Sequence, residues 1–262
     1  MNAPCAVDTV WPPRLALLAG GLATRLRPLT ATIPKSLITV AGEPFLAHQL
    51  RRLRANGLRD IVICCGHMGD QIEAFVGDGR GFGLSIMYSH DGNPLLGTGG
   101  ALRAALPLLG SRFLVMYGDS WLDQPIEPFW RAYLESGKPG LMSVFANANQ
   151  WGPSNVAYLR GAVLAYNKAR PSTAMHYIDY GLEPLDASVL AQWPTPAFDL
   201  SSVWSALADH GLLAGFETSQ RFYEIGSLPG LRETEAVITA GLLASDTRFT
   251  PPPPPDAQAA RS

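Results

Sequence analysis

Two patterns of apolar residues alternate along the first half of the chain. Short runs that are almost entirely apolar are typical of strands buried on both faces of a sheet, and they lie at residues 14–19, 60–65, 84–89 and 112–117. Longer stretches with apolar residues at helical spacing separate these runs, at residues 44–56, 70–76 and 98–109. Strands that alternate with helices in units of about thirty residues predict an α/β fold with a mostly parallel sheet.

The second half of the chain is less regular. Its patterns predict further strands at residues 140–146, 155–159, 162–167 and 176–182, and helices at residues 201–209 and 229–240. In the first half, residues 36–40 also form a run with strand propensity. We expect the second half to complete the sheet and to wall a ligand cleft. The domain would then cover residues 14–245, after an N-terminal extension of residues 1–13.

The composition is that of a globular protein without a strongly charged surface. Hydrophobic residues make up 47% of the 262 residues, charged residues make up 16%, and the formal net charge is −2. This balance gives no electrostatic argument for a nucleic-acid or membrane-surface partner. Three cysteines do not make a disulfide framework, and no segment reaches the roughly 20 apolar residues of a membrane span. We therefore expect a cytoplasmic protein.

The segment LALLAGGLATRLRPLTATIPKSLITV, residues 15–40, carries the strongest chemical signal. An apolar run ends in Gly20 and Gly21, and a loop with Arg25 and Lys35 follows. Glycines at a strand end let backbone N–H groups approach an anion closely, and the two cations supply charge for a polyphosphate. The spacing matches neither a GxxxxGK[ST] phosphate loop nor a GxGxxG dinucleotide motif.

A second glycine segment ends another predicted strand. Gly118 and Asp119 follow the apolar run at residues 112–117. In a parallel sheet, ligands bind beyond the carboxyl ends of the strands. The segment at Gly20 and the segment at Gly118 both fall at such an end, so we expect them to face the same ligand.

The segment at residues 15–40 resembles, nearly residue for residue, the signature LAGGxGTRLxPLTxxxPKxLxxVxGxP of the sugar-1-phosphate nucleotidyltransferases. Looser matches continue to about residue 240. The resemblance implies a Rossmann-like, three-layer α/β fold with a mostly parallel mixed sheet. It also implies a nucleotide-binding part at residues 14–120 and a sugar-binding part at residues 121–245. The chain is most similar to short bacterial members, which include heptose- and mannose-1-phosphate guanylyltransferases and muramate-1-phosphate uridylyltransferases.

The resemblance implies an enzyme that condenses a nucleoside triphosphate with a sugar 1-phosphate, giving a nucleotide-sugar and pyrophosphate. Arg25 and Lys35 take the places of the catalytic cations. The implied nucleotide-binding residues are Leu18, Ala19, Gly20, Gly21, Thr24, Arg25, Asn93, Gly97 and Thr98. Ala23 departs from the signature, which has glycine at that position. If the loop needs positive φ there, alanine costs about 1 kcal/mol.

The resemblance also implies a metal and an acceptor pocket. Asp119 and Glu224 match the two metal-binding carboxylates of the family, although Glu224 replaces an aspartate, and the metal would be Mg²⁺, with Mn²⁺ as a substitute. The implied sugar-phosphate-binding residues are Asn155, Lys168, Asp179 and Gly181. We expect no nucleic-acid or membrane partner, and a homodimer is left open.

Two other functions stay open at this level. One branch of the family transfers cytidylate to a non-sugar phosphate. A non-catalytic relative that binds nucleotide-sugars would keep the fold without turnover, and Ala23 and Glu224 are the residues that favour it. Retention of Arg25, Lys35 and Asp119 favours an enzyme. The chain length and the GTGGA segment at residues 97–101 favour guanine or uracil as the base, without choosing between them.

The chain ends in a segment of a different composition, residues 246–262, with five consecutive prolines at residues 251–255. Because proline donates no backbone hydrogen bond, this segment is predicted to be an extended polyproline stretch or disordered. Deleting the chain from Thr250 onward should leave the kinetic constants and the thermal midpoint almost unchanged. Steady-state kinetics and thermal unfolding of the truncated protein check this, and loss of an oligomer or a large drop in the midpoint would show a packing arm instead.

Overall fold

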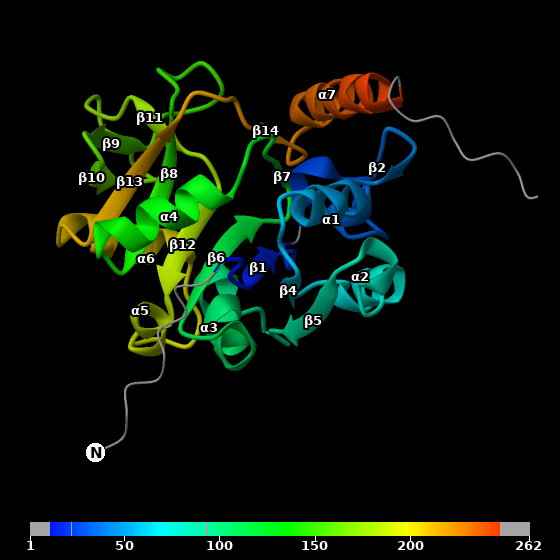
Figure 1. Ribbon diagram of the computed structural model, residues 1–262, viewed down its shortest axis with the longest axis horizontal. Helices are drawn as coiled ribbons and strands as arrows, with labels where there is room; N and C mark the ends of the chain where they lie inside the picture. The colour runs from blue at the N-terminus through cyan, green and yellow to red at the C-terminus, as the bar shows by residue number, and fades with distance from the viewer. Residues whose placement is uncertain (1–10, 22, 93, 247–262) are drawn as a thin grey trace, which may run out of the picture.

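The structure is a computed structural model that describes residues 11–21, 23–92 and 94–246. Four parallel strands form its first half: β1 (Leu15–Leu18), β4 (Asp60–Cys65), β5 (Ser85–His90) and β6 (Arg112–Tyr117). They lie in the order β6-β1-β4-β5, so β1 is central (Figure 1). Leu15 of β1 is level with Ile61 of β4 and with Leu114 of β6. The carboxyl ends of these strands therefore meet at one edge of the sheet.

The second half extends the same sheet with strands that pair mostly antiparallel. These are β8 (Gly140–Ala146), β9 (Val156–Leu159), β10 (Ala162–Tyr166), β11 (Tyr177–Asp179), β12 (Leu182–Asp186) and β13 (Leu213–Thr218). Strand β12 pairs with both β6 and β8 and so joins the two halves. Strand β11 pairs with both β9 and β8, so the strands β8-β13-β10-β9-β11 close into a ring. The fold is thus α/β with a mixed sheet, and its parallel strands lie mainly in the first half.

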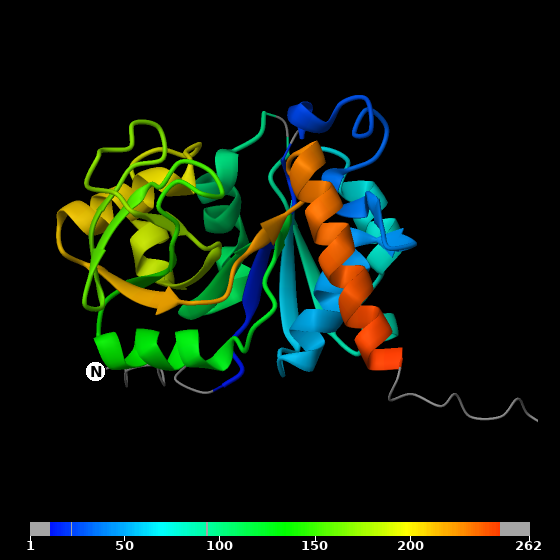
Figure 2. The ribbon, with the colours of Figure 1, turned by 90° about the horizontal axis from the view of Figure 1, so that it is seen from above.

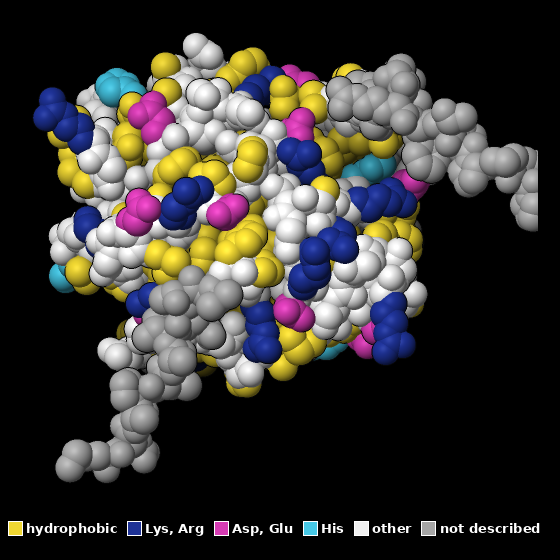
Figure 3. All heavy atoms as spheres, in the orientation of Figure 1, with side chains coloured by type: hydrophobic (Ala, Val, Ile, Leu, Met, Phe, Trp, Pro, Cys, Tyr) yellow, Lys and Arg dark blue, Asp and Glu magenta, His cyan; other side chains and the backbone are white. Residues whose placement is uncertain are grey.

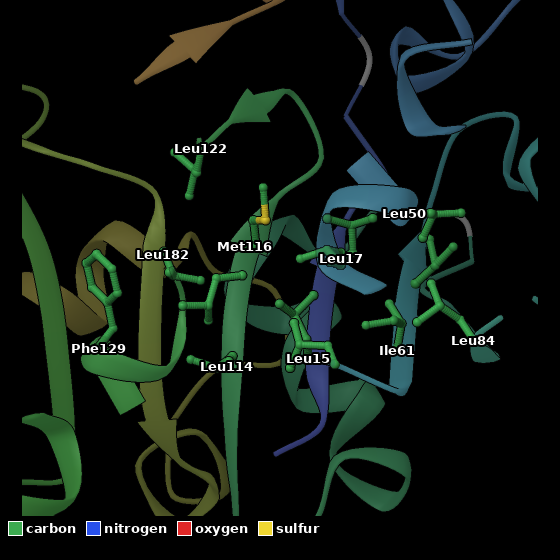
Figure 4. Packing of buried hydrophobic residues seen from close by; sticks show 14 of the residues in the cluster. Leu15, Leu17, Leu50, Ile61, Leu84, Leu114, Met116, Leu122, Phe129 and Leu182 are labelled. Carbon is green, nitrogen blue, oxygen red and sulfur yellow. The ribbon is translucent and has the colours of Figure 1, made fainter. Parts of the chain in front are cut away.

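Helices cover both faces of the sheet (Figure 2). The helices α1 (Phe45–Ala55), α2 (Gly69–Val76) and α4 (Glu127–Ser136) pack in one hydrophobic cluster, and α3 (Gly97–Leu109), α5 (Ala187–Ala191) and α6 (Leu200–Asp209) pack in another. Leu15 and Leu17 of β1 belong to the first cluster, whereas Ala16 and Leu18 belong to the second. Figure 4 shows Leu15 and Leu17 between Leu114 on β6 and Ile61 on β4. A strand buried on both faces needs apolar residues at every position, which explains the continuous run.

Short elements bring the late part of the chain to the carboxyl end of β6. The strand β7 (Ser120–Trp121) follows β6 and pairs with β14 (Tyr223–Glu224), and Ile225 donates its N–H to the carbonyl oxygen of Asp119 at 3.0 Å. Helix α7 (Leu228–Asp246) then lies beside the first half of the chain (Figures 1 and 2). Its residue Ile238 packs with Val40 and Phe45. The segment around Glu224 is therefore fixed next to Asp119.

Most of the predicted elements are confirmed, and two are wrong. Residues 36–40 do not form a strand, because a 3-10 turn (Lys35–Leu37) is followed by the two-residue strand β2 (Thr39–Val40), which pairs with β3 (Glu43–Pro44). Residues 176–182 are not one strand, because Gly181, at φ +89°, separates β11 from β12. Two further 3-10 turns are Thr24–Leu26 and Arg80–Phe82.

The predictions do not include α4 and β13. Strand β13 carries Gly215 at its centre, which weakens a strand pattern. The structure explains this glycine, because a Cβ there would lie 2.6 Å from the ring of Tyr158 inside the ring of strands. The packing of a distant aromatic side chain, rather than local propensity, selects glycine at this position.

The surface agrees with the balanced charge. On the face seen in Figure 3, basic and acidic side chains are interspersed, and no single sign covers it. Among the described residues, no helix is long and apolar enough to cross a membrane.

One carboxyl group in the sheet is fully buried beside a second carboxyl group. Glu183 on β12 is 0% exposed, and the carboxyl group of Asp179 is its nearest titratable neighbour. Burial raises the pKa of Glu183 well above its usual value of 4.5, and the nearby charge of Asp179 raises the pKa further. Glu183 therefore keeps its proton in the folded protein, since a buried carboxylate next to a second carboxylate is very costly.

This raised pKa predicts how Glu183→Gln changes stability with pH. Above about pH 4.5 the unfolded chain has lost the Glu183 proton while the folded chain still binds it, so this group lowers the free energy of unfolding as pH rises. Glutamine, which cannot ionise, removes this penalty, which amounts to about 1.4 kcal/mol for each pH unit between 4.5 and the raised pKa of the folded protein. The thermal midpoint of Glu183→Gln should therefore exceed that of the wild type by an amount that grows from pH 5 to pH 8.

Thermal unfolding at several pH values measures this difference. Each kcal/mol corresponds to about 2–4 °C in a protein of this size. Glu135→Gln, at an exposed position on α4, is the matched control and should give no pH-dependent difference. A difference for Glu183→Gln that stays constant with pH would contradict a protonated Glu183.

Candidate active site

A cavity of about 370 Å³ lies at the carboxyl edge of the parallel strands. We call it the strand-end cavity. It is lined by Leu18, Ala19, Gly20, Gly21, Lys35, Ser36, Cys64, Asp91, Leu95, Gly97, Thr98, Ala101, Tyr117, Gly118 and Asp119. Residues at the ends of all four parallel strands contribute to this lining. This is the position that the strand-end rule predicts.

Glycines let the strand ends approach one another. A Cβ on Gly20 would lie 2.8 Å from the nitrogen of Gly66, which follows β4, and a Cβ on Gly118 would lie 2.7 Å from the carbonyl oxygen of Leu18. Contacts this short exclude any side chain at either position. At these glycine positions the strand ends present backbone to the cavity, and backbone N–H groups are suited to binding phosphate oxygens.

The loop after Gly21 contains Ala23, which stands where the family signature has glycine and for which the sequence raises the question of a positive φ. Ala23 lies in the left-handed region, at φ 49° and ψ 38°, and precedes the 3-10 turn Thr24–Leu26. Its carbonyl oxygen accepts a hydrogen bond from the hydroxyl of Thr30 at 2.8 Å. The expected cost of about 1 kcal/mol therefore applies to Ala23. Thr24 and Arg25 are exposed on this loop and do not line the strand-end cavity.

Lys35 and Asp119 meet inside the cavity. The Nζ of Lys35 lies 2.5 Å from Oδ2 of Asp119, and both side chains are about a quarter exposed. The 3-10 turn at Lys35–Leu37 places Lys35, and the end of β6 places Asp119. An anion that entered the cavity would find the lysine already held at the edge of the sheet, and an ammonium group is a strong phosphate ligand.

The two carboxylates that the sequence singles out come close to each other at Gly226. The point where a Cβ of Gly226 would stand is 3.3 Å from Oδ2 of Asp119, 2.5 Å from Oε2 of Glu224 and 3.3 Å from Nη2 of Arg25. The carboxylate of Glu224 accepts hydrogen bonds from the N–H of Gly226 and from the hydroxyl of Ser227. Glu224 is thus turned toward the start of α7, and Arg25 reaches toward the same segment.

This donor set fits a magnesium ion that also binds substrate. Among the described residues, no group of three or more histidine, cysteine, aspartate or glutamate side chains could hold a metal. Two carboxylates beside a phosphate site are what Mg²⁺ commonly takes from a protein, because it keeps waters and binds substrate phosphates for the rest of its octahedron. Asp119 and Glu224 could supply those two carboxylates.

Glu224 also borders a second cavity, of about 190 Å³. The guanidinium of Arg221 lies there between the rings of Trp151, at 3.3 Å from the ring centre, and Tyr223, at 4.7 Å. Arg221 also pairs with Glu233 on α7. These contacts fix the loop before β14 and so help to fix the position of Glu224.

The glycine-rich segment at the start of α3 has a structural role beside its predicted one. Gly97 and Thr98 line the strand-end cavity, as predicted for nucleotide-binding residues. However, the N–H groups of Gly99 and Gly100 donate to the carbonyl oxygen of Phe198. A Cβ on Gly99 would lie 2.2 Å from the Phe198 ring. These two glycines therefore accommodate the loop before α6, while Asn93 lies outside the described residues.

The predicted acceptor residues cluster next to the cavity. Asn155 accepts a hydrogen bond from the N–H of Asp179 at 3.0 Å, and Asp179 accepts one from the N–H of Gly181 at 2.9 Å. The Nζ of Lys168 lies 6.0 Å from the centre of the Tyr117 ring. Tyr117 lines the strand-end cavity, and Lys168 and Gly181, whose Cβ position would lie 3.4 Å from the Tyr117 ring, both lie near this residue, although none of the four residues lines the cavity.

Several residues of the site are absent from the predictions. Ser36, Asp91, Leu95 and Tyr117 line the strand-end cavity, and Tyr117 directly precedes Gly118. Asp91 follows β5, so the strand-end rule, applied to every predicted strand, would have found both Asp91 and Tyr117. Cys64 also lines the cavity, but burial raises the pKa of its thiol to about 12, so it stays protonated at neutral pH.

Comparisons with known proteins agree with this geometry. N-acetylmuramate alpha-1-phosphate uridylyltransferase of Neisseria meningitidis serogroup B is 45% identical over 108 residues, which cover 41% of this chain and 47% of that protein. Mannose-1-phosphate guanylyltransferase catalytic subunit beta of Xenopus tropicalis is 28% identical over 217 residues, which cover 80% of this chain and 60% of that protein. The chain thus spans about half to three fifths of the length of these relatives.

A solved structure shares the fold. The inositol-1-phosphate CTP transferase of T. maritima superposes with a TM-score of 0.71 at 19% identity, covering 86% of this chain and 94% of that one. The sequence profile of the nucleotidyl transferase family matches residues 16–153, more than half of the chain. The matched range contains the glycine loop, Lys35, the start of α3 and Asp119. This chain belongs to the nucleotidyl transferase family.

Proposed function

We propose that this protein transfers a nucleotidyl group from a nucleoside triphosphate to a sugar 1-phosphate, releasing pyrophosphate. One observation carries the proposal: glycine backbone, Lys35 and Asp119 share a single cavity at the carboxyl edge of the parallel strands. The two sequence relatives reported above are named for N-acetylmuramate 1-phosphate and mannose 1-phosphate, which supports a sugar 1-phosphate as the acceptor, whereas the solved structure that shares the fold is named for inositol 1-phosphate.

In this reaction an oxygen of the acceptor phosphate attacks the α-phosphorus of the triphosphate. A new P–O bond forms as the bond to the bridging oxygen of the β-phosphate breaks, and pyrophosphate leaves with that electron pair. The protein has no covalent step to perform, so it acts by positioning and by neutralising charge. The backbone at Gly20 and Gly21 would hold the triphosphate, and Lys35 and Arg25 would offset the charge that builds up on the phosphate oxygens.

Asp119 and Glu224 would hold the magnesium ion beside these phosphates. The ion supplies Lewis-acid stabilisation of the phosphate charge when bound. Without it, Lys35 neutralises Asp119. The acceptor would lie between the strand-end cavity and the cluster of Asn155, Lys168 and Asp179, with its phosphate toward Lys168.

A pyrophosphate-release screen tests the proposal directly. The purified protein is incubated with each of ATP, GTP, CTP and UTP, together with a panel of sugar 1-phosphates and of non-sugar phosphates, in the presence of Mg²⁺. Release with a sugar 1-phosphate supports the proposal. Release that occurs with CTP and a non-sugar phosphate alone would point to the cytidylyl branch, and tight nucleotide-sugar binding without release would point to a non-catalytic relative.

Removing a cation from the loop should abolish turnover while the fold stays intact. Arg25→Ala and Lys35→Ala should each lose at least about 2.7 kcal/mol of transition-state stabilisation, a hundredfold in kcat/KM, because the phosphate charge is then left unbalanced. Arg27→Ala is the matched control, since Arg27 is exposed on the same loop. Near wild-type activity in either of the first two variants would contradict the assigned role of the loop.

Activity should require Mg²⁺ or Mn²⁺ and should disappear in a chelator. Asp119→Asn and Glu224→Gln should both be severely impaired, because an amide is a poorer ligand than a carboxylate for a hard divalent cation. Initial rates at graded Mg²⁺ concentrations measure the effect, with Asp123→Asn as a control, since Asp123 is largely exposed and pairs with Arg52. A Glu224→Gln variant with unchanged magnesium dependence would leave Asp119 as the protein's carboxylate ligand and remove Glu224 from the site.

A further inference from the structure

One acceptor in the strand-end cavity has no donor. Asp91 follows β5 and lines the cavity. Its Oδ2 accepts a hydrogen bond from the N–H of Leu96 at 3.2 Å. Its Oδ1 is buried and has no hydrogen-bond partner within the described residues. Buried polar atoms in proteins are nearly always paired, so an orphaned carboxylate oxygen beside a ligand cavity indicates a donor supplied by the ligand.

A second acceptor lies beside the first. Oδ1 of Asp91 and the carbonyl oxygen of Gly20 lie 3.0 Å and 2.8 Å from the point where a Cβ of Gly66 would stand, and Cδ2 of Leu95 lies 3.0 Å from it. Because Gly66 has no side chain, both oxygens can approach its Cα from within the site. Leu18 and Ala101 add apolar groups to the cavity lining. Acceptor oxygens next to apolar groups are suited to a planar ligand that stacks on the apolar groups and donates hydrogen bonds from one edge.

The four common nucleobases differ in how well their edges match the carboxylate oxygens of Asp91. Guanine places two donors side by side, N1–H and the 2-amino group. Uracil has one donor, N3–H, between two carbonyl oxygens, and these would face the acceptors of the protein. Adenine and cytosine each place an amino group beside a ring nitrogen that accepts. A carboxylate accepts and does not donate, so guanine is the base whose edge it complements.

We propose that Asp91 reads the N1–H and 2-amino donors of guanine, so that the nucleotide substrate of this protein is GTP. The proposal rests on the proposed function, because it takes the strand-end cavity as the nucleotide site. Asp91 would accept both donors through Oδ1 and the remaining lone pair of Oδ2, with the base stacked against the apolar lining. Charge-assisted bonds of this kind are stronger than neutral ones, and a base that leaves the carboxylate unpaired is rejected.

A thermodynamic cycle that removes Asp91 from the protein and the 2-amino group from the ligand tests guanine recognition through binding alone, without measuring the reaction. Isothermal titration with Mg²⁺ measures the Kd of GTP and of ITP, which lacks the 2-amino group, for the wild type and for Asp91→Asn. The wild type should bind GTP at least about tenfold more tightly than ITP or UTP. In Asp91→Asn the Kd of ITP divided by the Kd of GTP should fall to about one. XTP should gain affinity, because the amide can donate to its 2-carbonyl oxygen.

Controls separate base recognition from folding and from the reaction itself. Asp209→Asn, at an exposed position at the end of α6, should keep the wild-type preference, and the thermal midpoint shows whether Asp91→Asn folds. The comparison of GTP, ITP and UTP on the wild type decides the proposal even if that variant does not fold. The proposal would be overturned if the wild type bound UTP or CTP most tightly, or if it bound GTP and ITP equally. It would also be overturned if the ratio of the Kd values of ITP and GTP were the same in folded Asp91→Asn as in the wild type.

The same measurements distinguish the two proposals. Pyrophosphate release with UTP but not GTP would overturn guanine recognition and leave the nucleotidyl transfer standing. An Asp91-dependent preference for GTP without pyrophosphate release from any acceptor would support guanine recognition and overturn the transfer. Binding of none of the triphosphates would overturn both.

Discussion

The close approach of backbone at the carboxyl ends of β1, β4 and β6 is the constraint on which the site depends. Gly20 and Gly66 come so near that a Cβ on either would lie 2.8 Å from the other residue, and Gly118 packs as closely against Leu18. Since no side chain fits at these three glycines, rigid backbone groups that can bind phosphate are exposed there to the cavity. The parallel register of these strands makes this possible, because it brings all their carboxyl ends to one edge.

Charged side chains from distant parts of the chain surround this backbone surface. Lys35 comes from a turn after the first strand, and Asp119 comes from the end of β6, yet they form an ion pair. Glu224 joins them because β14 pairs with β7 and α7 packs against the first half of the chain. Arg25 approaches the same segment at Gly226. Cations and carboxylates in one place suit a reaction in which phosphate charge must be neutralised by both protein and metal.

The second half of the chain has two tasks. Through β12 it extends the sheet, and through the ring of β8, β9, β10, β11 and β13 it holds Asn155, Lys168 and Asp179 beside Tyr117. The loop before α6 packs on the glycines at the start of α3, so Phe198 helps to shape the wall of the cavity. Glu183 lies buried and protonated near Asp179, and this costs stability at neutral pH. Costs of this kind occur commonly where a protein binds ligands.

The sequence alone determined the alternation of strands and helices, the two-faced burial of β1 and the glycine loop with its cations, because these are encoded by residues close together along the chain. Its predictions were wrong at residues 36–40, where a turn places Lys35 in the cavity and ion-pairs it with the distant Asp119, and at residues 176–182, where Gly181 adopts positive φ and divides the strand. Only the tertiary structure placed Glu224 beside Asp119, set Phe198 on the α3 glycines and left an oxygen of Asp91 near Gly66 without a hydrogen-bond partner among the described residues. Each of these depends on which strand ends meet, and sheet order is a property of the packed chain, whereas the periodicity of its residues is local.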